Sequence, residues 1–173
     1  EEIIYAAGML PVRLTVDSRE LDLGEANAYM YINTCSFVRS CLEVVLRKQY
    51  DFLDGFVSGT TCDSSRRLTD VWKYYKLTPF VHILNVPRKM TERAHGLYRE
   101  EVQDFKHRLE EFFEVEISTQ ALWQAIKVYN RSRELLHRLY ELRKSDTLPI
   151  TGAEVLEVLN AGWKMPREQY NEL

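Results

Sequence analysis

The pattern of apolar residues changes between residues 50 and 75, and the change predicts a strand followed by a helix. A short apolar run, interrupted by Asp54 and Gly55, has the length of an inner parallel strand: Phe52, Leu53, Phe56 and Val57. Four residues then recur at the i, i+3, i+4 and i+7 spacing of a helix that buries one face: Leu68, Val71, Trp72 and Tyr75. Because Gly59 and Thr60 end the strand, we predict that Thr61 caps the helix and that Cys62 lies in its first turn.

The rest of the chain alternates strands with helices up to about residue 90 and is helical beyond it. Further strands are predicted at residues 11–16 and 80–86. Helical spacing and cap residues predict helices at about residues 35–48, 92–113, 118–144 and 151–162, and Pro166 opens another. Residues 1–8 have the pattern of a helix end, residues 17–28 predict a loop, and residues 29–32 fit either a strand or a helix.

This order of elements predicts an α/β fold. Strands that alternate with helices form parallel sheets, so we expect a short parallel sheet of three or four strands, Rossmann- or flavodoxin-like, with helix in excess. We expect residues 1–173 to form a single domain. Its strands and cysteine-bearing helices would lie in residues 1–90, and residues 91–173 would be all helical. The helix at 92–113 would bury one face: Ala94, Leu97, Tyr98, Phe105, Leu109 and Phe112.

Two segments of the chain repeat one arrangement of threonine, cysteine and arginine. Cys35 follows Thr34 and Cys62 follows Thr61, and each cysteine has an arginine four residues later, Arg39 or Arg66. In the first turn of a helix, unpaired amide N–H groups and the helix dipole favour a thiolate. Residues i and i+4 share a helix face, so each cysteine would have a guanidinium on its own side.

Two such thiolates suggest a pair of ligands for a metal or a cluster. The alternative interpretation is structural, in which each threonine is a cap and each cysteine is a small buried residue. The third cysteine, Cys41, lies about 240° further round the same helix than Cys35 and is predicted to fill the core.

Composition narrows the function classes. The chain has 45% hydrophobic and 28% charged residues, which is typical of a globular protein. Its net charge of −3 provides no broad attraction to nucleic acid or to an anionic membrane, and no apolar run reaches the ~18 residues of a membrane span. Three cysteines, too few for a disulfide framework, predict a reduced, cytoplasmic protein.

Several segments carry a resemblance to a known family. They are EEIIYAAGMLPVRL, CSFVRSCLE, YDFLDGFVSGTTCDSSRRLTDVWK, FVHILNVPRK, ISTQALWQAIKVYNRSRELLHRLYELRK and ITGAEVLEVLNAGWKMPREQ. In this order they resemble the benzoyl-CoA reductase and 2-hydroxyacyl-CoA dehydratase family. Subunits of that family are about twice as long, so the chain resembles the N-terminal half of one subunit.

The resemblance implies a 4Fe–4S cluster that transfers single electrons to a CoA thioester and forms a ketyl radical anion. Cys35 and Cys62 match two of the three cysteine ligands of the family, and the third would come from the C-terminal half. We therefore expect the 173-residue chain alone to be inactive. The implied partners are an acyl-CoA substrate, a homologous second subunit and an ATP-dependent iron–sulfur activator protein, because the chain has no Walker motif of its own.

Other site residues are predicted from their positions along the predicted strands and helices and from their chemistry. Arg39 and Arg66 are expected to bind substrate as charge-assisted donors to a carbonyl, ketyl or phosphate oxygen, with structural ion pairing as the alternative. Arg88 and Lys89 would lie at the carboxyl end of a strand, and Arg67 would be solvated. His82 is expected to be a hydrogen-bonded core residue. The NVPRK loop and the TCDSSRR turn resemble the benzoyl-CoA reductase branch of the family more, so the resemblance implies a benzoyl-CoA reductase-like subunit. A 2-hydroxyacyl-CoA dehydratase subunit and a non-catalytic cluster-scaffold protein are the alternatives.

Overall fold

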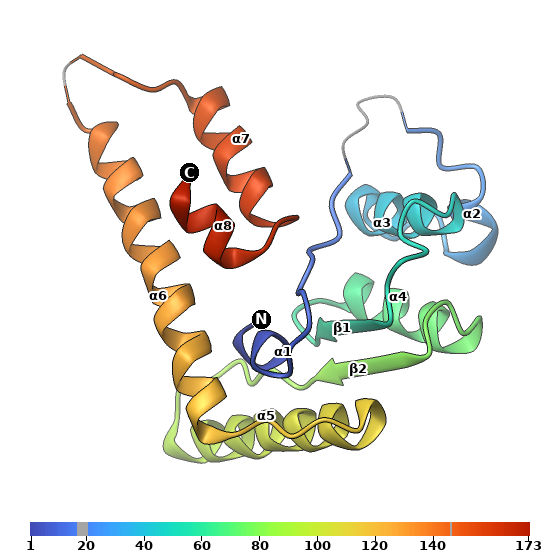
Figure 1. The fold of residues 1–173 in the computed structure, drawn as a ribbon. Helices are drawn as coiled ribbons and strands as arrows, with labels where there is room; N and C mark the ends of the chain where they lie inside the picture. The colour runs from blue at the N-terminus through green and yellow to red at the C-terminus, as the bar shows by residue number, and fades with distance from the viewer. Residues whose placement is uncertain (17–20, 146) are drawn as a thin grey trace. The chain divides into compact units, whose positions relative to one another are not determined.

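A computed structural model describes residues 1–16, 21–145 and 147–173. The described elements follow one another as α1 (Glu2–Ala6), α2 (Ala26–Tyr29), α3 (Ser36–Leu46), β1 (Gly55–Gly59), α4 (Asp63–Tyr74), β2 (Phe80–Leu84), α5 (Glu92–Phe113), α6 (Thr119–Leu142), α7 (Gly152–Gly162) and α8 (Arg167–Glu172) (Figure 1). The α/β class with helix in excess is confirmed. None of the helices in the described ranges is long and apolar enough to cross a membrane.

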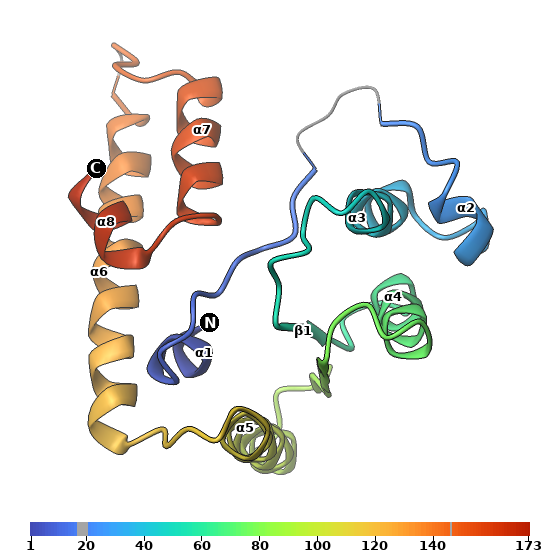
Figure 2. The same ribbon diagram turned by 45° about the vertical axis from the view of Figure 1, so that its right-hand side comes forward.

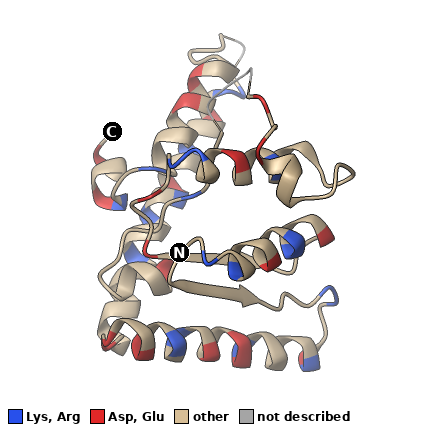
Figure 3. Ribbon diagram, turned by 90° about the vertical axis from the view of Figure 1, so that its right-hand side faces the viewer, with Lys and Arg blue, Asp and Glu red and all other residues tan. Residues whose placement is uncertain are grey.

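The backbone divides into two compact units. One comprises Leu14–Arg108 and the other comprises Glu1–Arg13 with Leu109–Leu173, so that α5 runs from one unit into the other. Charges of both signs are interspersed along α5, as expected for a helix with a solvated face (Figure 3). The division does not coincide with the predicted change at residue 90, and the single domain stays a prediction.

The first unit is built around a parallel pair of strands joined by a helix. β1 pairs with β2 in register from Gly55 opposite Phe80 to Gly59 opposite Leu84, and both arrows in Figure 1 point the same way. The predicted parallel pairing is therefore confirmed. The described sheet has two strands, however, rather than the three or four that we predicted.

Residues 11–16 were predicted as a strand and are not one. Pro11 has no N–H group to contribute to a ladder. The N–H of Thr15 donates to the side-chain hydroxyl of Tyr50 at 3.1 Å, and the N–H of Arg13 donates to the Trp163 carbonyl, just after α7, at 3.0 Å. These are isolated hydrogen bonds and not the ladder of a strand. The alternation of β-branched residues led to the strand prediction, but no strand of the described chain pairs with this segment.

β1 begins and ends later than the apolar run predicted. Phe52 is 64% exposed and lies before the strand, which comprises Gly55–Gly59. A Cβ atom at Gly55 would lie 3.1 Å from the Phe80 ring, so the first pair of the ladder depends on the absence of a side chain there. The strand is therefore placed by its contact with β2 as well as by its own apolar residues.

The core of this unit lies between α3, α4 and the sheet. Trp72 of α4 is fully buried, and its ring stacks on that of Phe56 at 4.0 Å between centroids. Its indole N–H donates to the Thr78 hydroxyl at 2.8 Å, which in turn donates to the Phe80 carbonyl at 2.9 Å. Figure 2 shows α3 and α4 close to end-on. These contacts hold α4 to both strands.

The long helices agree with the predicted ranges to within about two residues. Ser118 accepts a hydrogen bond from the Ala121 N–H, and Thr151 with Glu154 forms the predicted capping box. The face expected to be buried in α5 is covered only in part. Phe105 and Leu109 are buried, whereas three of its other residues are more than 40% exposed: Leu97, Tyr98 and Phe112.

The second unit packs α1 and α8 against α6. The Tyr5 ring contacts the Tyr129 ring edge to face at 5.8 Å, and the Ser132 hydroxyl donates to Asn171 at 2.6 Å. Gly162, the last residue of α7, lies directly under the Tyr170 ring of α8. A Cβ atom at Gly162 would lie 2.6 to 2.9 Å from that ring, closer than any real contact allows.

Replacing Gly162 by alanine is therefore expected to destabilise the protein. Overpacking of this kind costs about 1–3 kcal/mol, because the Tyr170 ring has to move. Urea unfolding of Gly162→Ala should show a lower midpoint than that of the unmodified protein.

Gly96→Ala provides a matched control. Gly96 lies within α5, and a Cβ atom there has no neighbour within 4 Å among the described residues. Alanine is favoured over glycine in a helix by about 1 kcal/mol, so this variant should be as stable as the unmodified protein or more stable. Equal midpoints for the two variants would contradict the packing of α8 on Gly162.

Candidate functional site

The turn between β1 and α4 is held by the end of β2 and the residues that follow it. The N–H of Thr60 donates to the Leu84 carbonyl at 2.9 Å, and the Thr60 hydroxyl accepts from the Val86 N–H at 3.0 Å. A Cβ atom at Gly59 would lie 3.3 Å from the Val86 side chain, so the approach is close. These contacts give Cys62, two residues after Thr60, a defined place at the carboxyl end of β1.

Cys62 is itself the N-cap of α4. It has an extended backbone, and its Sγ accepts from the Ser65 N–H at 3.4 Å. Our prediction that Thr61 caps this helix is wrong, because the helix begins at Asp63 and the thiol takes the place of the hydroxyl. A thiolate at Cys62 is still favoured, as expected. The hydrogen bond from the Ser65 backbone N–H lowers the pKa of Cys62 most, and the Ser65 side chain lowers it further. The thiol is exposed and available to a ligand.

Cys35 has the corresponding position on α3. It is the N-cap of a helix that begins at Ser36, and it is exposed, but its side chain makes no cap hydrogen bond. Thr34 is not the cap that the structural interpretation would have made it. Its carbonyl instead accepts from the Arg39 guanidinium. The two segments are therefore alike in placing a free thiol immediately before a helix, and they differ in what holds that thiol.

The helices that carry the two cysteines share a core. Val38 and Leu42 of α3 lie in the same cluster of buried residues as Leu68 and Trp72 of α4. Placement at the carboxyl edge of the sheet is observed for Cys62, which follows β1 directly. The same placement for Cys35, and a separation of the two sulfurs within ~7 Å, stay predictions.

Cys41 lies in the core, as predicted. It is 3% exposed among apolar residues of α3 and the sheet unit. Burial, with a smaller contribution from Cys35, raises the pKa of the Cys41 thiol to about 11. This cysteine therefore remains a protonated core residue and is no candidate ligand.

The two matched arginines have different surroundings. Arg39 is half-buried and donates to the Thr34 carbonyl at 3.0 Å and to the Asn27 side chain at 2.6 Å. Arg66 is exposed, and among the described residues its guanidinium has no hydrogen-bond or ion-pair partner. Arg67 is 54% exposed, as predicted, with ion pairs to Asp63 and Asp70.

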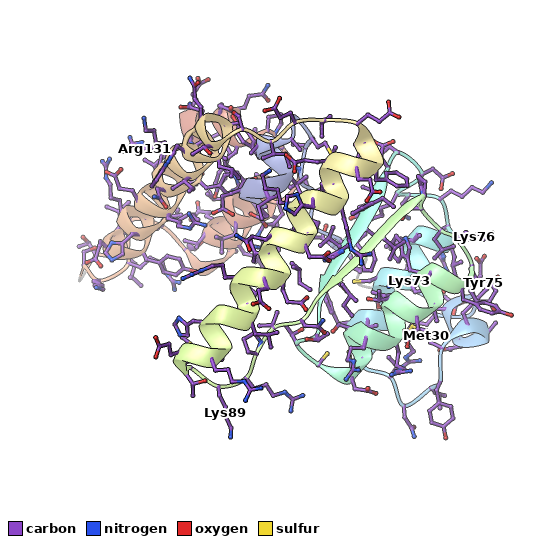
Figure 4. The ribbon with its side chains drawn as sticks, turned by 90° about the horizontal axis from the view of Figure 1, so that it is seen from below. Met30, Lys73, Tyr75, Lys76, Lys89 and Arg131 are labelled. Carbon is purple, nitrogen blue, oxygen red and sulfur yellow. The ribbon has the colours of Figure 1, made fainter. Side chains whose placement is uncertain are left out.

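The segment after β2 borders the same turn. Both amides of Asn85, the backbone N–H and the side-chain Nδ2, donate to the Glu101 carboxylate, which ties this segment to α5. Arg88 and Lys89 follow and are exposed. Figure 4 shows Lys89 projecting away from the ribbon at the turn that precedes α5. These cations are available to a ligand, but no contact in the described structure directs them toward a cysteine.

His82 is a core residue, as expected, although it lacks the predicted hydrogen bond at one nitrogen. Its ring lies 5.0 Å from the Phe105 ring, and its Nε2 has no hydrogen-bond partner among the described residues. Burial, followed by the Arg108 charge, lowers the pKa of His82, so the ring is neutral near pH 7. A neutral ring against Phe105 fits a packing role.

The sequence pattern missed a buried carboxylate. Glu43 lies within the apolar face of α3 and is fully buried. Its Oε2 accepts from the Ala26 N–H at 2.7 Å and its Oε1 from the Arg47 guanidinium at 2.8 Å. An acidic residue between Leu42 and Val44 with an arginine four residues later was the available signal.

The two exposed cysteines are the candidate metal ligands among these groups. Within the described ranges, no group of three or more His, Cys, Asp and Glu side chains could hold a metal ion. The two exposed cysteines at helix N-caps are the soft ligands that iron–sulfur clusters use, and Cys62 has a stabilised thiolate. The donors present therefore fit a cluster in chemical type, and other ligands would have to complete its coordination.

Comparison with known proteins agrees with this chemistry. The family model HGD-D, described as 2-hydroxyglutaryl-CoA dehydratase, D-component, matches residues 1–173. A benzoyl-CoA reductase subunit of Thauera aromatica is 32% identical over 173 residues, covering 99% of this chain and 45% of that protein. The beta subunit of (R)-2-hydroxyglutaryl-CoA dehydratase of Acidaminococcus fermentans is 28% identical over 176 residues, covering 99% of this chain and 46% of that protein.

The chain spans about half the length of the curated relatives that it matches. The match to the family model nevertheless extends over all 173 residues, and the resemblance found in the sequence is confirmed. The chain belongs to the 2-hydroxyglutaryl-CoA dehydratase D-component family, which the names of its relatives connect with benzoyl-CoA reductase and 2-hydroxyacyl-CoA dehydratases.

Proposed function

We propose that this chain supplies two thiolate ligands, Cys35 and Cys62, to a 4Fe–4S cluster in an enzyme that reduces a CoA thioester. The observation that carries the proposal is the N-cap position of Cys62, where an exposed thiol accepts the Ser65 N–H at the end of a strand. Membership of the family supports the same function. The reaction is the one-electron, ketyl-radical type that benzoyl-CoA reductase-like enzymes would carry out.

The bound cluster would supply electrons at the low end of the iron–sulfur range, near ~−700 mV. The residues of this chain would hold it and shape its surroundings. Cys62 is placed by the Thr60 and Ser65 contacts, and Cys35 by the start of α3. Other ligands, including a third cysteine, would come from outside these 173 residues, because the chain matches only about half the length of its relatives.

Arg66 and Arg39 are proposed to bind the substrate. Arg66 is the stronger candidate, because its exposed guanidinium has no partner among the described residues and lies four residues after Cys62. A guanidinium near a thioester carbonyl would donate charge-assisted hydrogen bonds to the oxygen on which negative charge develops. Arg39 already uses two of its nitrogens on Thr34 and Asn27, so its other N–H groups would make the contact.

The proposed partners follow from what the chain lacks. A homologous second subunit would complete the enzyme, as the names of the relatives suggest. ATP-driven activation would require a separate iron–sulfur activator protein, because the sequence has no Walker motif. All three cysteines are free thiols, which fits a reducing compartment such as the cytoplasm.

Two other functions remain as candidates. A 2-hydroxyacyl-CoA dehydratase role is supported by the dehydratase named in the family model and by a relative at 28% identity. A non-catalytic cluster scaffold would use the same thiols without a substrate. Turnover of benzoyl-CoA, of a 2-hydroxyacyl-CoA or of neither, by the complete protein with its partners, distinguishes the three.

Iron content tests the assignment of the ligands. In the complete, anaerobically purified protein, Cys35→Ser and Cys62→Ser should each lose most of the iron and the acyl-CoA turnover. Cys41→Ala should keep both, because Cys41 is buried and protonated. Iron retained by both serine variants would refute the assignment of the cysteines as ligands.

The 173-residue chain alone is expected to be colourless and inactive. Two thiolates do not complete the ligand set of a cubane cluster, and both cysteines are exposed to water in this chain. Anaerobic reconstitution with iron and sulfide, followed by visible spectroscopy, measures the outcome. A stable absorbance near ~400 nm with four irons per chain would mean that no further ligand is needed.

The pH dependence of alkylation tests the thiol pKa values of the exposed Cys62 and the buried Cys41. The pKa of Cys62 lies below the 9.0 of an ordinary thiol, so its rate of reaction with iodoacetamide should level off at a lower pH than that of a free cysteine. Cys41 should stay unreactive over the same range. Ser65→Ala removes one of the groups that stabilise the thiolate and should move the Cys62 profile to higher pH. An unshifted profile in this variant would contradict that contribution.

A further inference from the structure

Two residues of α3 and the C-cap residue that follows them form a stripe of charges on one helix face. Arg39, Glu43 and Arg47 are spaced at i, i+4 and i+8, so their side chains lie along one side of the helix. Most of their partners come from the segment that leads into the helix, residues 22–34: Asp22, Ala26, Asn27 and Thr34. One helix face therefore binds the segment that precedes Cys35.

Glu43 binds the beginning of that segment. Its fully buried carboxylate accepts the Ala26 N–H at 2.7 Å and pairs with Arg47 at 2.8 Å. The Arg47 Nη2 extends the contact to the Asp22 carbonyl at 2.9 Å. A buried carboxylate without these partners would be strongly unfavourable, so the segment and the side chain stabilise each other.

Arg39 binds the end of the segment. Its Nη1 donates to the Asn27 side chain at 2.6 Å, and its Nε donates to the Thr34 carbonyl at 3.0 Å. That carbonyl belongs to the peptide group that joins Thr34 to Cys35. A fixed Thr34 carbonyl therefore restricts the backbone from which the Cys35 side chain projects.

Comparison with Cys62 indicates why Cys35 would need such a contact. Cys62 follows a strand, its turn is hydrogen-bonded to the end of β2 and to Val86, and its thiol accepts from the Ser65 N–H. Cys35 follows no strand, and its side chain makes no cap hydrogen bond. Ala26 and Met30 of the segment are buried in the core, but the residues between Met30 and the helix, such as Tyr31 and Ile32, are exposed. The contact of Arg39 with the Thr34 carbonyl therefore restrains the part of the segment nearest to Cys35.

We propose that Arg39 and Glu43 are positioning residues, which hold the segment before Cys35 on α3 and thereby present the Cys35 thiol in one fixed geometry. The use of that thiol as a cluster ligand rests on the proposed function. The restraint of the segment does not, so the two can fail separately.

Amide hydrogen exchange measures the restraint directly. In the purified protein, Arg39→Gln removes both contacts, and the amides of Met30 and Thr34, which donate to Ala26 and Tyr31, should exchange about tenfold faster or more. Exchange in residues 60–65 should not change. Arg39→Lys keeps the charge but lacks the planar fork that reaches two acceptors, so it should not restore protection.

A nitroxide attached to Cys35 in a Cys62→Ser background gives a second measurement. Its spectrum should narrow in Arg39→Gln, because the backbone that carries the label becomes more mobile. Glu43→Gln should have the same effect on the beginning of the segment, with faster exchange at Ala26.

Arg67→Gln is the matched control, because Arg67 is also an arginine near a cysteine at a helix N-cap, and its ion pairs stay within α4. It should leave exchange and label mobility unchanged. The proposal is overturned if Arg39→Gln changes neither measurement, or if it accelerates exchange equally in residues 60–65, which would indicate general destabilisation. Loss of iron has no part in either measurement, so a wrong assignment of the cluster would leave these results intact.

Discussion

The stacking of Trp72 on Phe56 is the contact on which the cysteine-bearing unit depends. It fixes α4 against β1 at 4.0 Å, and the indole N–H reaches β2 through Thr78. Once the helix and both strands are held, the short turn between Gly59 and the helix has little freedom. The position of Cys62 therefore depends on a hydrophobic contact made by Trp72, ten residues further along the chain. Trp72 acts through the helix and the strands, because it has no polar contact with the turn that carries Cys62.

The two cysteine segments show how one local sequence can be supported by two kinds of structure. Threonine, cysteine and a following helix are common to both, and in both the cysteine is the N-cap. The tertiary contacts differ, because one segment follows a parallel strand and the other follows a loop. A repeated motif therefore encodes the helix start but not the contacts that orient it. Those contacts come from Thr60 in one case and from Arg39 in the other.

Sequence reasoning succeeded where a pattern is local and failed where the partner is distant. The long helices, the capping box at Thr151 and the buried Cys41 follow from spacing alone, and they were predicted correctly. The strand at 11–16 was wrong, because β-branched alternation does not say whether another strand lies alongside. Thr61 was wrong as a cap because a thiol can take the same role. Glu43 was missed because its partners, Ala26 and Asp22 through Arg47, lie about twenty residues away.

The proposed chemistry places opposite demands on the Ser65 N–H. A hydrogen bond to sulfur stabilises the Cys62 thiolate, which favours binding of a metal, but hydrogen bonds and nearby cations also raise the potential of a bound cluster. A donor near ~−700 mV requires the reverse. Exclusion of water is the remaining means of lowering the potential, and neither Cys35 nor Cys62 is covered by the residues described in this chain. In the proposed enzyme, the low potential would therefore be set by the parts that cover these cysteines, while this chain would provide the ligands and their geometry.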